Sequence, residues 1–562
     1  MNPSHSAQKA PLALIKFINF FAILIILLSV VGWFYWAQHG PEIIEAAYRG
    51  HSIPMVNKYL AIHRSIDPAH RDLQYFLEKG LPVLPRLFGM MILLQFIALF
   101  AIHFGWQRIR AFFSTPTHPV NLAIFRIALF GALFIFADAG TTIRASQFPE
   151  ILKAAPPGWG GLLNILPIDQ TSATVIVRIF QISCLLAMVG LFTRVSATLA
   201  VISGIYVLGI PQFFGKIDHY HHLLWFTAIL AASRCADVLS VDAWLAARRK
   251  NSAEKLQTPQ PNVIYSRPLR FVWLLIGVIY FFPGFWKFVI GGLDWALTDN
   301  MRYLVYTRWL QLDWTPVFRG LDHPILYKIG GLGVIIFELL FIFLLFFPRL
   351  RKYAIGTGIS FHLMTFLLMR INFWTLLISY LAFFDFEKIY QRLVQKQRSS
   401  VAAISENHGE KRFGKRSVVI VGSFLLIVNS LCGFLLIDSW PFAVYPTFAT
   451  VEEPYTQSIT FALKSNDGSV IETTPWEREA ITKYIRTPRI LGLVWRVLWT
   501  TDPRLRQQRA KAMVDLFGKY DPVFRQAVSI QIYESIVSVI PERWHDAPLR
   551  RTRIFEYFHK TP

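Results

Sequence analysis

The chain has 562 residues, of which 54% are hydrophobic and 15% aromatic, and its mean hydropathy is +0.41. This composition excludes an ordinary soluble protein and places the chain in the polytopic membrane class. The formal net charge of +22 would suggest nucleic-acid binding in a soluble protein, so the distribution of the basic residues decides what the charge means.

Long apolar runs divide the chain into predicted membrane spans. A spanning helix needs roughly 20 mainly apolar residues, and about eleven such runs occur. The first run is longer than a signal-peptide core and lacks a small-residue cleavage site, so we predict a retained span. The predicted spans are residues 11–36, 84–104, 120–139, 173–192, 196–213, 219–232, 271–288, 326–347, two spans within 353–386 that bend near 370–374, and 417–437.

Basic residues gather in four of the segments that join the spans, at 106–110, 234–270, 349–352 and 388–416. Counting the spans puts all four segments on the same side of the membrane. By the positive-inside rule that side is cytoplasmic, so we predict a cytoplasmic N-terminus and an extracytoplasmic C-terminus. The positive charge then faces anionic membrane lipid, and we predict no nucleic-acid partner.

Residues 438–562 are expected to form a small extracytoplasmic domain, either α+β or mostly helical. The stretch SITFAL-KSNDG-SVIETT predicts a hairpin with Asn466, Asp467 and Gly468 in its turn. The stretches PRLRQQRAKAMVDLF and QAVSIQIYESIVSVI are interpreted as two helices, the first strongly basic. The domain is expected to dock on the membrane surface or on the outer mouth of the helical bundle.

Ionisable side chains within the predicted spans are candidates for function, because placing them in lipid is costly. Arg126 and Arg178 could instead pair internally or extend to the interface, and Asp138 could cap a helix end. Three cysteines occur, without the spacing of a disulfide framework or a zinc site. The candidates are Arg126, Asp138, Arg178, His219, His222, Lys287, Glu338, His362 and Arg370.

Lys287 and His219 stand at the ends of two consecutive spans, which an antiparallel pair would bring to the same side of the membrane. Lys287 follows Phe285 and Trp286, where loss of water favours the neutral amine, and a neutral amine can act as a base. The alternative for Lys287 is an interfacial anchor, and for His219 an interfacial hydrogen bond.

The sequence around His219 also raises the question of a metal site. Asp218 and His222 stand four residues apart and His219 and His222 three apart, so two ligands could share one helix face. Only His362 is a distant candidate to complete the ligand set. We therefore predict no metal site.

From about residue 120 to residue 386 the chain resembles the transmembrane domain shared by vitamin K-dependent gamma-carboxylases and their bacterial relatives, the HTTM family. The order of the similar stretches and the spacing between His219 and Ser240 also fit. The similar stretches are NLAIFRIALFGALFIFAD, GKIDHYHHLL, SVDAWLAARRKN, IYFFPGFWKF followed by Leu293-Asp294-Trp295, GGLGVIIFELLFIFLLFF and SFHLMTFLLMRINFW.

The resemblance implies roles for particular residues. Lys287 falls on the lysine taken as the base that deprotonates the quinol, and His219 falls on a histidine with a protonating or positioning role. Glu338 matches an intramembrane carboxylate. We therefore predict Lys287 and His219 as catalytic residues, and as cofactor-binding residues Trp286, His222, Glu338, His362 and Arg370.

The reaction implied by the resemblance uses O2 to convert a quinol to its epoxide, and the base so generated takes a proton from glutamate before CO2 adds. The implied cofactors are a reduced quinone similar to vitamin K hydroquinone, O2 and CO2. The expected partners are membrane lipid, a lipid-soluble quinol and a peptide or protein substrate on the outer side. Relative to the family, Trp286 replaces a first lysine and residues 289–292 are an insertion.

These observations predict an all-α polytopic membrane helical bundle of about 11 spans with a small extracytoplasmic C-terminal domain, located in a bacterial inner membrane. The predicted function is a gamma-carboxylase-like membrane enzyme, a quinol-dependent lyase. The alternative is a non-enzymatic protein that binds a lipid, a quinone or a partner protein through its outer face. The predicted parts are an N-terminal two-span unit (1–115), the HTTM domain (116–390), a basic linker (391–416), the last span (417–437) and the C-terminal domain (438–562).

Overall fold

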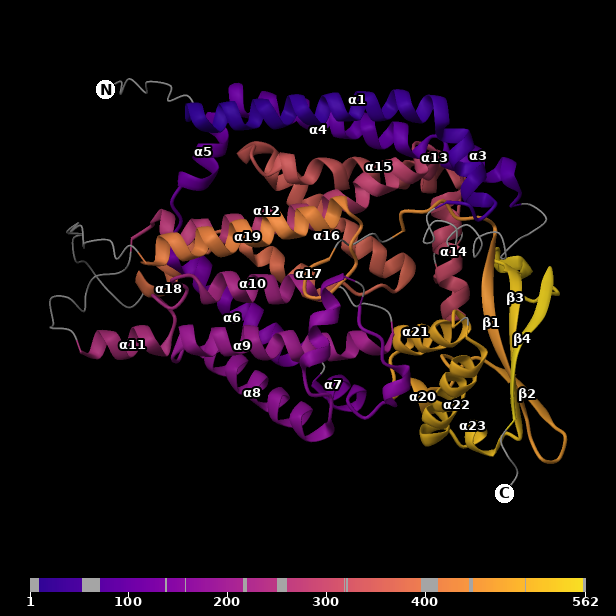
Figure 1. Ribbon diagram of the computed structural model, residues 1–562. Helices are drawn as coiled ribbons and strands as arrows, with labels where there is room; N and C mark the ends of the chain where they lie inside the picture. Colours follow the sequence, from indigo (N-terminus) through magenta and orange to yellow (C-terminus); the bar gives the residue numbers. More distant parts are fainter. Residues whose placement is uncertain are drawn as a thin grey trace. The chain divides into compact units, whose positions relative to one another are not determined.

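Helices dominate the computed structural model of the chain (Figure 1). The predictions made for Asp218, His219, Asp138 and most of the basic linker lie outside the residues that the structure describes. The described residues are 10–52, 71–136, 139–156, 158–215, 220–249, 260–317, 319, 322–395, 413–443, 448–500 and 502–558.

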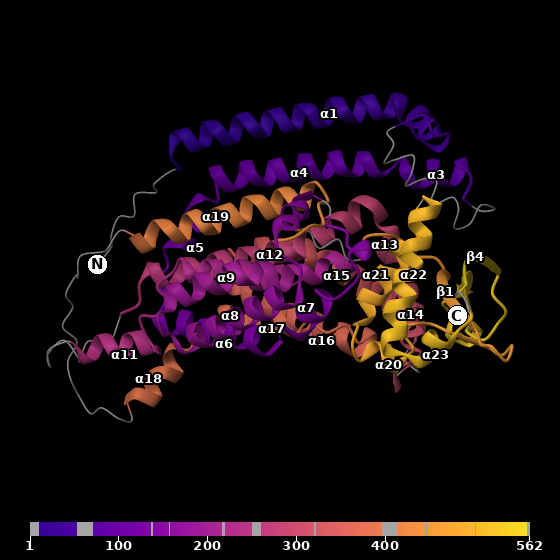
Figure 2. The ribbon, with the colours of Figure 1, turned by 60° about the horizontal axis from the view of Figure 1, so that its bottom comes forward.

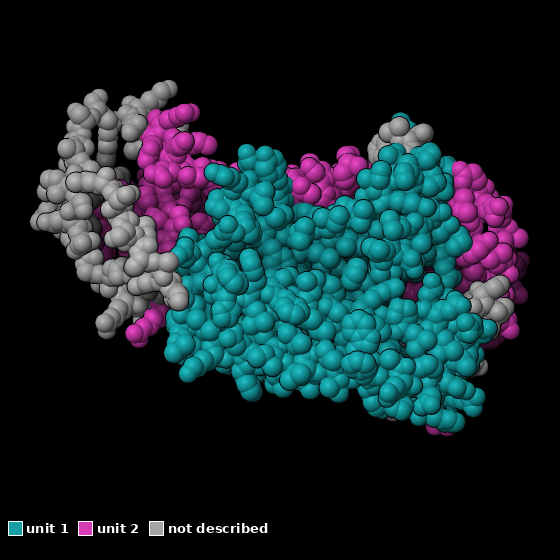
Figure 3. Space-filling model, turned by 90° about the horizontal axis from the view of Figure 1, so that it is seen from above, with its two compact units in different colours: residues 1–113, 280–354, 446–454 teal, residues 114–279, 355–445, 455–562 magenta. Residues whose placement is uncertain are grey.

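The chain falls into two compact units, which Figure 3 shows in different colours. Two of their boundaries lie inside helices α12 (Val263–Gly291) and α16 (Pro348–Met369), so each of these helices contributes one part to each unit. Unit 1 comprises Met1–Phe113, Tyr280–Ala354 and Pro446–Pro454, and unit 2 comprises Ser114–Ile279, Ile355–Tyr445 and Tyr455–Pro562.

Unit 1 is helical, and its two longest helices, α1 and α4, run side by side in both ribbon views (Figures 1 and 2). Both helices are apolar and little buried, as expected for helices that face lipid chains. Besides parts of α12 and α16, the helices of unit 1 are α1 (Leu12–Tyr48), α3 (Leu73–Gly80), α4 (Val83–His103), α5 (Trp106–Ser114), α13 (Asp294–Leu297), α14 (Asn300–Leu312) and α15 (Pro324–Leu344).

Unit 2 contains a helical bundle and the C-terminal domain. Helices α8 and α9 form an antiparallel pair joined by a tight turn at Gly190–Phe192, and α6 and α10 pack against them. The helices of this bundle are α6 (Pro119–Phe136), α7 (Ala139–Ala145), η1 (Glu150–Leu152), η2 (Gly158–Ile165), α8 (Gln170–Val189), α9 (Thr193–Gly209), η3 (Ile210–Phe214), α10 (His221–Ala231), α11 (Val241–Arg248), α17 (Trp374–Ser379), η6 (Tyr380–Phe383), α18 (Glu387–Gln395) and α19 (Phe413–Phe434).

Within the described residues, 8 helices are long and apolar enough to cross a membrane. They correspond to eight of the predicted spans, with α1 extending to Tyr48, well beyond the predicted end at residue 36. The remaining three predictions fall on shorter or more polar helices: α10 has 11 residues, α16 begins with several basic residues, and α17 with η6 forms a short apolar segment. The predicted bend at 370–374 is present, because Arg370 adopts a left-handed conformation (φ 53°) between α16 and α17.

The C-terminal domain is α+β. Its four-stranded antiparallel sheet has the order β2-β1-β3-β4, and β1 (Tyr455–Lys464) and β2 (Val470–Thr473) form the predicted hairpin with Gly468 (φ 84°) in the turn. The first predicted helix is confirmed as α22 (Pro503–Tyr520). The other elements are α20 (Glu479–Thr482), α21 (Thr487–Leu498), α23 (Pro522–Gln526), β3 (Ser529–Ser538), η7 (Pro541–Arg543) and β4 (Arg550–Phe558).

The second helix predicted in this domain is wrong, because QAVSIQIYESIVSVI forms strand β3. Ile530 and Ile532 alternate with more exposed residues and are buried on one face of the sheet, which is the period of a strand rather than a helix. Pairing with β1 along its whole length and with β4 on its other side gives β3 the central position in the sheet.

Two arginines attach the C-terminal domain to the helical bundle of unit 2. Arg496 of α21 donates hydrogen bonds to the backbone oxygens of Leu152 and Phe213, and Arg509 of α22 donates to the oxygen of Ile151. Burial and the neighbouring Arg509 and Arg489 lower the pKa of Arg496 to about 10. The charged side chains thus satisfy carbonyl groups at the ends of short helices, which have no helical partner of their own.

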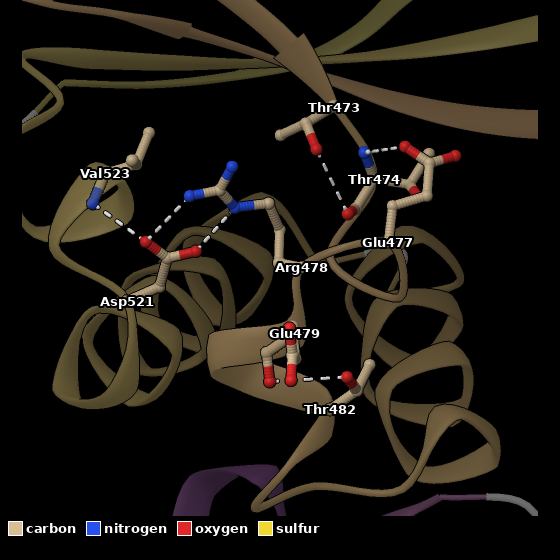
Figure 4. A network of polar contacts seen from close by, with 8 residues as sticks. All are labelled: Thr473, Thr474, Glu477, Arg478, Glu479, Thr482, Asp521 and Val523. Carbon is tan, nitrogen blue, oxygen red and sulfur yellow. Dashed lines mark hydrogen bonds and ion pairs between the residues drawn. The ribbon is translucent and has the colours of Figure 1, made fainter.

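Inside the C-terminal domain, Asp521 joins three elements (Figure 4). Its carboxylate accepts hydrogen bonds from both Nε and Nη2 of Arg478, at 2.6 and 3.1 Å, and from the backbone N–H of Val523 at the start of α23. Burial raises the pKa of Asp521, but the hydrogen bonds from Arg478 and Val523 outweigh it and hold the pKa below its usual value of 3.8.

A lowered pKa means that the ionised Asp521 stabilises the folded domain above about pH 4, and that this contribution is lost as the pH falls through the folded-state value. We expect Asp521→Asn to reduce the free energy of unfolding of the C-terminal domain by about 2 kcal/mol at pH 7. Hydrogen–deuterium exchange of β1 and α22 in the full-length protein measures this, and the difference between variant and native protein should shrink at pH 3.

The exposed Asp546 provides the matched control, because Asp546→Asn removes a solvent-exposed carboxylate from the same domain. Equal effects of the two substitutions, or an Asp521→Asn effect that is the same at pH 7 and pH 3, would contradict the assigned role of Asp521.

Candidate functional site

A buried ion pair between Lys287 of α12 and Glu338 of α15 forms the centre of the candidate site in unit 1. The Lys287 Nζ atom donates to both carboxylate oxygens of Glu338, at 2.6 and 2.7 Å. Each residue is only 3% exposed. Burying one of these charges alone would cost far more free energy than burying the hydrogen-bonded pair. Each residue therefore stabilises the other in its buried position.

The two helices approach closely because α12 carries glycine one turn before Lys287. A Cβ atom at Gly284 would lie 2.7 Å from Cβ of Glu338 and 3.1 Å from the backbone nitrogen of Leu339. Any side chain at this position would force α15 away from α12. The glycine in the sequence PGFWK therefore sets the separation at which the Lys287 amine reaches both oxygens of Glu338.

Aromatic rings surround the ion pair. Phe285 is fully buried and Trp286 nearly so, and the Lys287 Nζ atom lies 5.2 Å from the centre of the Trp295 ring. Two turns before the lysine along α12, Tyr280 contacts Phe337 and Phe341 of α15. The ring of Trp295 attracts the ammonium through its negative face, while the other rings keep water away from the pair.

The position of Trp295 depends on residues 448–453, which we call the strap. The Trp295 indole N–H donates to the backbone oxygen of Phe448 at 2.8 Å. Asn300 connects the two segments, because its side chain donates to the oxygen of Trp295 and accepts from the backbone N–H of Glu452. Burial and the neighbouring Glu453 raise the pKa of Glu452.

Residues 289–292 form the end of α12 and the turn that follows it. These residues continue the helix to Gly291, and Gly292 then turns the chain with φ 60° into α13, which carries Trp295. Arg86 of α4 donates a hydrogen bond to the backbone oxygen of Ile290 at 3.1 Å. Residues 289–292 therefore extend the helix and lead the chain to Trp295, whose ring lies over Lys287.

The remaining predicted residues lie in unit 2 or outside the described residues. His222 and His362 are buried on α10 and α16, and the ring of His362 lies 4.8 Å from that of Phe373. Arg370 is exposed where α16 ends. The structure thus brings Lys287, Trp286 and Glu338 together in unit 1, while the role of His219 stays a prediction.

Arg126 and Arg178 follow the non-catalytic alternatives. Arg126 is fully buried on α6 and donates to the backbone oxygens of Cys235 and Leu239, so it fixes the segment that follows α10. Arg178 is exposed and donates to Gln181 on the same helix. Among the described residues, no group of three or more His, Cys, Asp or Glu side chains could hold a metal ion.

Sequence reasoning assigned no role to Gly284 or to the strap. The glycine could have been noticed, because it lies one turn before Lys287 on the same predicted span. The strap follows the last span by sequence and lies far from Trp295 along the chain, so no local pattern indicates its contact with that residue.

The close approach at Gly284 is testable by adding a single methyl group. We expect Gly284→Ala to destabilise the protein by about 1–3 kcal/mol through overpacking against Glu338. The matched control is Gly333→Ala on α15, where an added Cβ meets no atom within 4 Å and alanine favours the helix. Thermal unfolding in detergent should show a lower midpoint for Gly284→Ala alone, and equal midpoints for both variants would contradict the assignment.

Comparison with known protein families agrees with the resemblance seen in the sequence. No curated protein and no solved structure matches the chain. Residues 113–387, close to half of the chain, match the family model described as HTTM domain, which is consistent with an HTTM domain in this region.

Proposed function

We propose that this protein is an integral-membrane enzyme of the gamma-carboxylase type, which acts on a lipid-soluble quinol with Lys287 as general base. The observation that carries the proposal is the buried Lys287–Glu338 pair beneath Trp295. Ionisable residues are rarely placed within apolar spans without a function, and the pair lies within the region that matches the HTTM family.

The pair can store a proton at either of two atoms. With the proton on nitrogen, the ammonium and carboxylate neutralise each other. Transfer of one proton along the 2.6 Å hydrogen bond gives a neutral amine beside a neutral carboxylic acid, and loss of water favours such neutral forms. The amine can then accept a proton from a quinol hydroxyl, while Glu338 supplies or holds the second proton.

The residues around the pair fit an aromatic ring in chemical character. Trp286 and Trp295 present flat apolar surfaces, and aromatic pairs are stabilised beyond the area that they bury. A reduced quinone, when bound, would supply the electrons that reduce O2. We assign contacts with the quinone to Trp286 and Glu338, whereas the roles that the sequence predicts for His219, His222, His362 and Arg370 stay predictions.

We further propose the membrane arrangement derived from the charges, with about eleven spans, the N-terminus in the cytoplasm and the C-terminal domain outside a bacterial inner membrane. Within unit 2, α11 and α18 lie at one end and the C-terminal domain at the other in both ribbon views (Figures 1 and 2). This separation supports the assignment, since the segments that contain α11 and α18 are basic.

Turnover tests the proposal directly. Purified protein in nanodiscs should convert a reduced naphthoquinone to its epoxide under O2, and labelled CO2 should enter a glutamate-containing peptide if the full reaction is retained. We expect Lys287→Met and Glu338→Gln each to reduce the rate of epoxidation at least 100-fold, because general base catalysis contributes about 10² to 10⁴.

A double variant separates catalysis from folding. Lys287→Met leaves a buried carboxylate without its partner and should cost about 3–5 kcal/mol, whereas Lys287→Met combined with Glu338→Leu should recover most of that stability. Lys328→Met on α15 is the matched lysine control. A folded double variant with native turnover would refute Lys287 as the base.

A non-enzymatic function is the second candidate, and the closed geometry of the pair favours it. Both oxygens of Glu338 accept from Lys287, which is the arrangement of a structural ion pair. In that case quinone binding, followed by quenching of tryptophan fluorescence, would persist without any turnover, and the double variant would bind quinone as the native protein does.

A further inference from the structure

Unit 2 contains a cavity of about 500 Å³ at the end of the bundle where α11 lies (Figure 1). It lies between the turn that joins α8 to α9 and the segment that follows α10. Its size is within the range of small-molecule sites. The lining residues are Phe192, Thr193, Arg194, Val195, Leu230, Ser233, Arg234, Cys235, Ala236, Asp237 and Asp242.

The two carboxylates of the lining are already engaged by donors of the protein. Asp242 accepts from the backbone N–H groups of Phe192 and Thr193 and from the Thr193 hydroxyl. These hydrogen bonds and Arg126 outweigh the effect of burial and lower the pKa of Asp242. Asp242 therefore serves as a fixed anchor for the first turn of α9.

Asp237 is engaged in a similar way. It accepts the Tyr265 hydroxyl at 2.7 Å and pairs with Arg234 at 2.8 Å. Among the described side chains that line the cavity or contact its lining, the guanidinium groups are those of Arg126, Arg194 and Arg234. They stand against the two engaged carboxylates. The balance of charge in and behind the cavity is positive, which favours an anion.

An apolar rim adjoins the polar interior of the cavity. Phe192 and Val195 line the cavity and are 69% and 62% exposed. Further along α9, Leu199 and Ile202 continue this exposed apolar surface toward the middle of the span. An arginine-lined space that continues into an apolar helix surface suits a ligand with an anionic head and hydrocarbon chains.

We propose that this cavity binds the phosphodiester head group of an anionic glycerophospholipid, with Arg194 and Arg234 contacting the phosphate and the acyl chains lying along α9. The site is independent of the proposed reaction at Lys287. It differs from general attraction of basic segments to the membrane surface, because it requires a particular pair of arginines at the mouth of one cavity.

Native mass spectrometry of the full-length protein in detergent tests the proposal with phosphatidylglycerol and phosphatidylcholine of identical acyl chains. We expect phosphatidylglycerol to be retained preferentially. Retention should fall about fivefold in Arg194→Gln and further in Arg194→Gln with Arg234→Gln, since each basic residue near an anionic head group contributes a factor of that order.

The matched control is Arg248→Gln, because Arg248 is basic and lies on α11 at the same end but stacks on Trp244 and does not line the cavity. Thermal midpoints in lipid-free detergent identify any variant that fails to fold, and Arg194→Lys, which keeps the charge, should then retain the lipid.

Equal retention of the two lipids, or an equal loss in Arg248→Gln, would overturn the proposal. Displacement of the lipid by millimolar inorganic phosphate would show a soluble anion site and would also overturn it.

Discussion

The buried ion pair between Lys287 and Glu338 is the interaction on which unit 1 depends. Each ion loses its hydration, and only close contact with the other offsets that loss. The requirement for contact fixes the distance between α12 and α15, which in turn requires glycine at position 284. The strap holds the Trp295 ring over this pair through the hydrogen bond to Phe448. A displaced ring would admit water to the pair and weaken its electrostatic attraction.

The same constraint appears in unit 2 with backbone groups as partners. Arg126 donates to two carbonyl groups after α10, and Asp242 accepts the first N–H groups of α9. Arg496 reaches from the C-terminal domain to carbonyl groups of the bundle. In each case a charged side chain hydrogen-bonds backbone groups at a helix end, where helical partners are missing. Charge in this protein therefore fixes the ends of short or closely joined helices.

Local signals in the sequence predicted a large part of this fold. Apolar runs located the eight long apolar helices of the described residues, and Asn466, Asp467 and Gly468 located the hairpin. Strand β3 was missed because its apolar residues also fit a helical face, and its central place in the sheet depends on β4, which no local pattern linked to it. The residues of the ion pair were both chosen as candidates, but their contact depends on which helices pack together. That choice is made by Gly284 and by tertiary packing, which a single sequence does not encode locally.

The geometry of the ion pair also limits how the proposed enzyme could work. While the Lys287 ammonium donates to both oxygens of Glu338, its nitrogen has no lone pair with which to accept a further proton. A proton must therefore pass from Lys287 to Glu338 before the Lys287 amine can accept a proton from a substrate. The neutral amine could then accept the proton of a quinol hydroxyl, while Glu338 holds the proton that Lys287 gave up.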